Sequence, residues 1–193
     1  MQDKPQVCLG FDICYIWISL QFGVKEVGCL FFAEVGGGTY MQPLDGSSVV
    51  KVQVSVVENP EEASFFEPYE AAHSMHDLSS LIAQHCRLEL TVRQKYGALS
   101  RGDGAIYLRF PYKGYREKIW DHAAGCIVVT DMDQFHSIIE AGGVVIDTAW
   151  QPLDFSKGKH LDMDTGIIVT NQKLMPLLLN VVKKSLKEKA PSS

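Results

Sequence analysis

The feature that most constrains the fold is the run from residue 117 to residue 148. A polar start containing Asp121 leads into an apolar stretch, and Gly142-Gly143 introduces a β-branched segment. Carboxylates are favoured near a helix N-terminus, where unpaired N–H groups attract negative charge. We therefore expect a helix over Glu117–Thr130 and a strand over Gly143–Thr148. On this pattern alone, Asp121 is either an ordinary first-turn acid beside a packed Trp120 or a functional carboxylate.

The segment from residue 28 to residue 57 predicts an antiparallel meander. Short turns, one of them Asp45-Gly46, separate three runs with strand character. The expected strands are Gly28–Val35, Thr39–Leu44 and Val49–Val57. Residues 1–27 are apolar but give no clear assignment beyond two strand-like runs.

The remaining chain alternates helix and strand signals. After a loop over Glu58–Ala72 with one helical turn, Ser74 and Asp77 have the spacing of a capping box before a helix. Two more strands are expected over Ala105–Phe110 and Gly166–Thr170, and Asn171 is expected to cap a C-terminal helix with Pro176 in its first turn. Residues 87–93 remain unassigned. The sum is a layered α/β domain.

Composition excludes several classes of protein. The 193 residues carry a net charge of −5 with 46% hydrophobic residues, and no basic patch indicates a nucleic-acid partner. The longest uninterrupted apolar run near the N-terminus, Ile13–Ile18, is far shorter than the ~20 residues that span a bilayer. Five irregularly spaced cysteines indicate neither a disulfide framework nor a zinc site. We expect a soluble, intracellular protein without a membrane or nucleic-acid partner, and no targeting signal is evident.

Two longer patterns resemble a known family. The run W-D-H-A-A-G over residues 120–125, followed later by E-A-G-G-V-V, is similar to the C-terminal signature of the inositol monophosphatase superfamily of lithium-sensitive, metal-dependent phosphomonoesterases. The stretch Glu117–His122 most resembles the 3'(2'),5'-bisphosphate nucleotidases, and plant members in particular. The densest similarity covers Asn59–Phe66, Ala98–Gly125 and Pro152–Pro176.

The resemblance implies a fold and an activity. Residues 28–189 correspond to the C-terminal layered α/β portion of the inositol monophosphatase, or sugar phosphatase-like, fold, with the N-terminal half missing. Residues 1–27 are divergent, residues 131–139 look inserted, and residues 190–193 form a tail. The family's activity is Mg²⁺-dependent removal of the 3'-phosphate of adenosine 3',5'-bisphosphate to give AMP. Its sulfo derivative and inositol polyphosphate 1-phosphates are further implied substrates.

The resemblance also assigns site residues. The family's nucleotide-binding positions fall on His73, Lys95, Arg109 and Asp121, with Asp121 also a metal ligand. Lys and Arg suit phosphate binding, although taken singly Lys95 and Arg109 could equally form surface ion pairs. The segment Pro43–Ser47 looks like a degraded copy of the family's D-P-x-D-G-T metal motif. It lacks the first Asp and is better explained as a hairpin turn.

Departures from the family pattern leave alternatives open. The other metal-binding carboxylates are not found, Val92 replaces a nucleotide-binding serine, and Trp150 stands where relatives have Gly. Intact blocks separated by foreign ones suggest an alternative or mispredicted transcript. The chain is then either a working phosphatase, an inactive truncated isoform that binds nucleotide or associates with a full-length subunit, or a chain that does not fold stably.

Overall fold

The computed structural model describes residues 29–34, 37–68, 74–88, 90–92, 96–130, 142–161, 163 and 166–189. Within them, five strands form a mixed sheet in the order β5-β4-β6-β8-β7. Strands β4 and β5 are parallel, as are β4 and β6, whereas β8 runs antiparallel to both β6 and β7. The strands are β4 (Phe65–Glu67), β5 (Leu90–Val92), β6 (Ile106–Arg109), β7 (Gly143–Asp147) and β8 (Ile167–Asn171).

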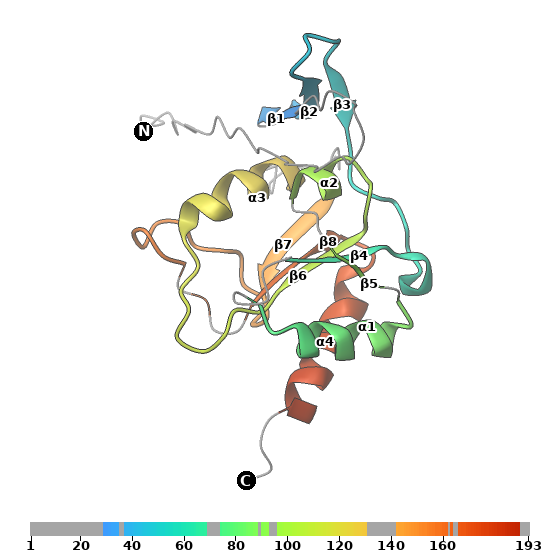
Figure 1. Ribbon diagram of the computed structural model, residues 1–193, viewed down its shortest axis with the longest axis vertical. Coiled ribbons are helices and arrows are strands. Elements are labelled where there is room, and N and C mark those ends of the chain that lie inside the picture. The colour runs from blue at the N-terminus through green and yellow to red at the C-terminus, as the bar shows by residue number, and fades with distance from the viewer. Residues whose placement is uncertain are drawn as a thin grey trace, which may run out of the picture.

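Helices cover both faces of this sheet (Figure 1). Helices α1 (His76–Cys86) and α4 (Met175–Lys189) pack together below it, and α2 (Tyr96–Ser100) and α3 (Ala123–Val129) lie above it. Strands β6 and β8 are buried along their whole length because they are covered on both sides. The two hydrophobic cores follow from this arrangement, with Leu108 in the core beneath the sheet and Tyr107 in the core above it.

A three-stranded antiparallel meander lies beyond α2 and α3 (Figure 1). It consists of β1 (Cys29–Glu34), β2 (Gly38–Pro43) and β3 (Val50–Val52). Its turn at Asp45-Gly46 is a hairpin turn as expected: Gly46 has φ +84°, and the Asp45 carboxylate accepts hydrogen bonds from Ser47. Phe31 points from β1 into the upper core, and Thr39 donates a hydrogen bond to the Val128 carbonyl of α3. The meander is thus fixed to the layered part of the molecule.

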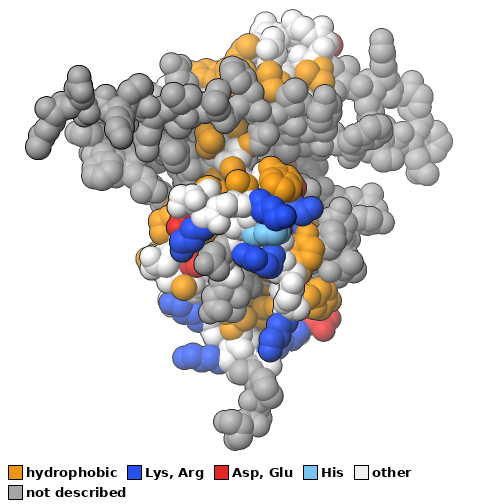
Figure 2. Space-filling model, turned by 90° about the vertical axis from the view of Figure 1, so that its left-hand side faces the viewer, with side chains coloured by type: hydrophobic (Ala, Val, Ile, Leu, Met, Phe, Trp, Pro, Cys, Tyr) orange, Lys and Arg blue, Asp and Glu red, His pale blue; other side chains and the backbone are white. Residues whose placement is uncertain are grey.

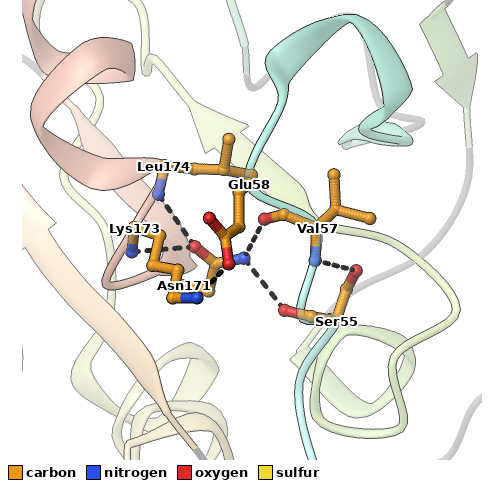
Figure 3. Close-up of polar contacts among 6 residues, drawn as sticks. All are labelled: Ser55, Val57, Glu58, Asn171, Lys173 and Leu174. Atoms are coloured by element: carbon orange, nitrogen blue, oxygen red, sulfur yellow. Dashed lines mark hydrogen bonds and ion pairs between the residues drawn. The ribbon is translucent and has the colours of Figure 1, made fainter.

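Asn171 joins three segments at the end of β8 (Figure 3). Its Oδ1 accepts hydrogen bonds from the backbone N–H groups of Lys173 (3.0 Å) and Leu174 (2.8 Å), just before α4 begins. Its Nδ2 donates to the carbonyls of Ser55 (2.9 Å) and Val57 (2.7 Å). Helix α4 begins at Met175, four residues after Asn171, so Asn171 does not cap the helix itself as expected. Its side chain instead caps the turn that leads into α4, and it also anchors the segment that follows β3.

Several expected elements differ in detail. The third strand of the meander is β3 alone, much shorter than Val49–Val57. The capping box is wrong, since α1 has no side-chain cap and the Ser74 hydroxyl instead accepts a hydrogen bond from the Phe110 backbone N–H at 3.3 Å. Strands β4 and β5 and helix α2 were not predicted, because runs of three to five residues carry too little periodicity. The single turn expected within the loop is the 3₁₀ helix η1 (Pro60–Glu62).

Two predictions cannot be followed further. The apparent insertion over residues 131–139 and the divergent residues 1–27 lie outside the described residues. Among the residues that are described, no helix is long and apolar enough to cross a membrane.

Candidate functional site

Asp121 lies in a 3₁₀ turn and not in the first turn of an α-helix. The turn is η2 (Ile119–Asp121), and α3 begins only at Ala123. The expected helix start at Glu117 is wrong because the backbone there is extended and already paired: Glu117 O accepts from Leu161 N–H at 2.9 Å, and Lys118 forms a β-bridge with His160. The turn leaves the Asp121 side chain exposed to solvent.

Arg109 is the last residue of β6 and forms a buried ion pair with Glu117. The pair joins Arg109 Nε and Glu117 Oε1, and the side chains are 6% and 0% exposed. The sequence left open a surface ion pair for Arg109, but the structure shows a buried one. Burial, the largest single effect, lowers the pKa of Arg109, yet the hydrogen bonds and charges of Glu117 and Tyr107 together outweigh it and raise that pKa. The guanidinium is therefore permanently charged and fixed at the end of the strand.

Glu117 also forms a hydrogen bond with His122 through its second carboxylate oxygen. The imidazole Nε2 lies 3.0 Å from Glu117 Oε2, and its Nδ1 lies 2.8 Å from the Tyr96 hydroxyl. A carboxylate can only accept, so Nε2 carries a proton. Burial raises the pKa of Tyr96 well above its usual value, so its hydroxyl stays protonated and can donate to a neutral Nδ1. Arg109, Glu117, His122 and Tyr96 thus form one continuous buried network, called here the Glu117 network.

Close packing against Tyr96 explains why the W-D-H-A-A-G run ends in glycine. A Cβ on Gly125 would fall 2.2 Å from the ring of Tyr96, too close for any side chain. This approach lets α3 pack on α2, which places Tyr96 against His122. The run therefore builds the Glu117 network and also carries Asp121 on its exposed side.

Two of the four predicted nucleotide-binding residues can be located. Arg109 pairs with Glu117, and Asp121 directly precedes His122, which is hydrogen-bonded to Glu117. His73 and Lys95 lie outside the described residues. Sequence reasoning missed the roles of Glu117, His122 and Tyr96. A usable signal existed: an arginine that ends a fully buried strand needs a counter-charge, and Glu117 is the first acid after it.

The donor set around Asp121 does not by itself form a magnesium site. Among the described residues, no group of three or more His, Cys, Asp or Glu side chains could hold a metal ion. Mg²⁺ prefers an octahedron of oxygens with one or two carboxylates and several waters. Asp121 could contribute one exposed carboxylate, and any further protein ligands would come from outside the described residues.

Comparison with known proteins defines the class to which this fold and site belong. The sequence profile of the inositol monophosphatase family matches residues 17–187, and the chain belongs to this family. Among solved structures, SuhB of Bartonella henselae superposes with a TM-score of 0.55 at 20% identity, covering 81% of this chain and 53% of that one. The Thermotoga maritima IMPase gives 0.56 at 18% identity, covering 83% and 54%. At these identities the match establishes the fold alone.

Curated relatives with much higher sequence identity are named bisphosphate nucleotidases. The chain is 65% identical over 174 residues to 3'(2'),5'-bisphosphate nucleotidase 1 of Arabidopsis thaliana, covering 87% of this chain and 47% of that protein. It is 54% identical over 168 residues to the 3'(2'),5'-bisphosphate nucleotidase of Oryza sativa, covering 84% and 44%. The expected family and fold are confirmed. The chain spans about half the length of the curated relatives it matches.

Proposed function

We propose that this chain supplies the nucleotide-binding half of a phosphatase that removes the 3'-phosphate of adenosine 3',5'-bisphosphate to give AMP. One observation carries the proposal: the exposed Asp121 is held next to the buried Glu117 network, in a chain that is 65% identical to a named bisphosphate nucleotidase. The sulfo derivative and inositol polyphosphate 1-phosphates share the phosphate monoester and are proposed as further substrates.

Arg109 would bind the nucleotide with guanidinium donors that its contacts within the described residues do not use. A guanidinium carries five N–H groups, and in this part of the chain Glu117 and Tyr107 engage only part of the set. Because the ion pair fixes the plane of the guanidinium, the remaining donors would meet a phosphate with little loss of side-chain entropy. His73 and Lys95 are proposed as further nucleotide-binding residues.

Asp121 would hold Mg²⁺ together with ligands from outside the described residues. A Mg²⁺ ion held there would lower the pKa of a coordinated water and stabilise negative charge on the leaving oxygen. This chain would contribute the Asp121 carboxylate. The Glu117 network would hold the backbone of Asp121 in place, because Glu117 and His122 lie on either side of the turn that carries it.

A second candidate function is nucleotide binding without turnover, with the chain acting as a partner of a longer subunit. The observation that favours it is the donor set at Asp121, which is too small for a metal site within the described residues. Hydrolysis and simple binding both require the same nucleotide site. They differ only in whether further carboxylates reach Asp121.

Release of inorganic phosphate from adenosine 3',5'-bisphosphate separates the two functions. The 193-residue chain would be assayed with Mg²⁺, with and without Li⁺, beside Asp121→Asn and the exposed control Asp77→Asn. Turnover that is lost in Asp121→Asn and kept in Asp77→Asn supports the phosphatase. Saturable binding without turnover supports the binding subunit. A folded chain that neither binds nor hydrolyses the nucleotide contradicts both.

A further inference from the structure

Basic side chains from two distant segments meet on one face of the molecule. Arg116 and Lys118 precede η2, whereas Lys159 and His160 belong to the loop between β7 and β8. The segments are joined by the bridge between Lys118 and His160 and by a hydrogen bond from Ile119 N–H to Lys159 O at 3.1 Å. Figure 2 shows Lys and Arg side chains gathered around a histidine on this face. The sequence showed no such cluster because about 40 residues separate its halves.

Three cations of this cluster lie in solvent without an ion-pair partner among the described residues. Arg116, Lys118 and Lys159 are exposed, and none of them forms an ion pair with a described carboxylate. The nearest acid in sequence to Lys118 is Glu117, which is already occupied by Arg109 and His122. The pKa of His160 is lowered by burial and then by Arg116, Lys159 and Lys118, so all three cations act on the same point.

An aromatic surface adjoins the cluster. The side chain of Trp120 is 56% exposed, and the Lys118 ammonium lies 5.5 Å from the centre of its ring. Exposed Trp beside cations is a common element of nucleotide-binding surfaces, because the ring can stack on a base while the cations bind phosphate. The protein as a whole is acidic, with a net charge of −5, so a concentration of cations here is a local feature.

We propose that Arg116, Lys118, Lys159 and His160, together called the basic surface, bind a small anion that carries at least two phosphate groups. Several exposed cations that form no ion pair within the described residues suit a ligand with several negative charges, and Arg can bind phosphate with two N–H groups. The net negative charge of the protein disfavours a long polyanion such as nucleic acid. The basic surface needs neither metal nor Asp121, so this inference does not rest on the proposed function.

Titration with inorganic tripolyphosphate tests the basic surface directly. Calorimetry in EDTA at low salt would compare the native chain with the triple variant Arg116→Gln, Lys118→Gln and Lys159→Gln. The matched control removes three exposed lysines from α4: Lys183→Gln, Lys184→Gln and Lys187→Gln. We expect affinity to fall about tenfold or more in the first variant and to stay within about twofold in the control, since only contacting charges form charge-assisted hydrogen bonds.

The outcome is decisive in either direction. An equal loss in the two triple variants would show a general charge effect and overturn the proposal, as would the absence of tripolyphosphate binding at low salt. A parallel titration with ATP identifies the source of the phosphates: tighter binding that Trp120→Ala removes assigns a nucleotide, and equal binding assigns free polyphosphate. Because tripolyphosphate has no ribose and EDTA removes Mg²⁺, these results are independent of phosphatase activity.

Discussion

Arg109 and Glu117 form an ion pair in the interior of the molecule, with both side chains almost completely removed from solvent. The pair connects the end of β6 to the segment that carries Asp121. Without it, the end of a core strand would hold an uncompensated charge, at a cost of several kcal/mol. The position of the candidate site therefore depends on an interaction that also stabilises the fold.

Removing the charge of Glu117 should destabilise the protein strongly. In Glu117→Gln, Arg109 stays charged and buried without its partner, so we expect a loss of about 3–5 kcal/mol in the free energy of unfolding, measured in urea. The control is Glu61→Gln, which breaks an exposed ion pair with Arg87 and should cost less than about 0.5 kcal/mol. Similar losses in the two variants would contradict a structural role for the buried pair.

The same carboxylate should make stability depend on pH. Burial acts to raise the pKa of Glu117, but the hydrogen bonds from His122 and Arg109 outweigh it and hold the pKa below 4.5. A carboxyl group whose pKa is lower in the folded than in the unfolded state stabilises the protein at pH values above the unfolded-state pKa. This contribution is lost as the pH falls through the folded-state pKa. The difference in stability between the native chain and Glu117→Gln should therefore stay constant above about pH 5 and narrow as the pH falls below 4.5, the ordinary pKa of Glu. A difference that stayed constant over the whole range would argue against a depressed pKa.

Both the oxygen and the nitrogen of the Asn171 side-chain amide should contribute to stability. In Asn171→Ala we expect a loss of about 2–4 kcal/mol, because the turn before α4 loses the acceptor of its Lys173 and Leu174 N–H groups and the carbonyls of Ser55 and Val57 lose their donor. Asn171→Asp keeps the acceptor, so hydrogen exchange at the Leu174 amide should stay slow in Asp and become fast in Ala. Lys173→Gln removes only the exposed ion pair with Glu58 (Figure 3) and serves as the control. Fast exchange in both Asn171 variants would contradict the acceptor role of Asn171 Oδ1 in the turn before α4.

Trp150 should be replaceable by glycine with a gain in stability. Its φ is +69°, a left-handed conformation that costs a non-glycine residue about 1–2 kcal/mol, and its side chain is 45% exposed. Trp150→Gly is expected to raise the free energy of unfolding by up to about 1 kcal/mol after the greater chain entropy of glycine is subtracted. Trp120→Gly, at a position with ordinary φ, should be neutral or destabilising. A loss of stability in Trp150→Gly would show that the indole packs better than its exposure suggests.

Trp150 also shows what can be predicted from the sequence. The resemblance predicts Gly at this position, and the residue there has a positive φ that Gly adopts without strain. The meander, α1, α4 and the strands β6, β7 and β8 are predictable because each has a long period or a clear turn signal. The family was recognised from specific runs of residues. Hydrophobic periodicity alone predicts secondary structure and not function.

The site was predicted only in part, for a physical reason. Glu117 was expected to be helical, but its backbone is paired with residue 161, more than 40 positions away. The ion pair of Arg109 and the basic surface likewise depend on contacts that local patterns do not contain. Such patterns report propensity, and tertiary pairing overrides it.

The central claim is that this chain carries a site for a bisphosphate nucleotide, and calorimetric titration of the folded 193-residue chain with adenosine 3',5'-bisphosphate tests it most directly. In the presence of Mg²⁺ we predict saturable binding, with adenosine at least about tenfold weaker because it lacks the phosphates. Asp121→Asn should weaken the binding, and the exposed control Asp77→Asn should not. Equal affinity for adenosine and the bisphosphate, or identical affinities in the two variants, would contradict the claim.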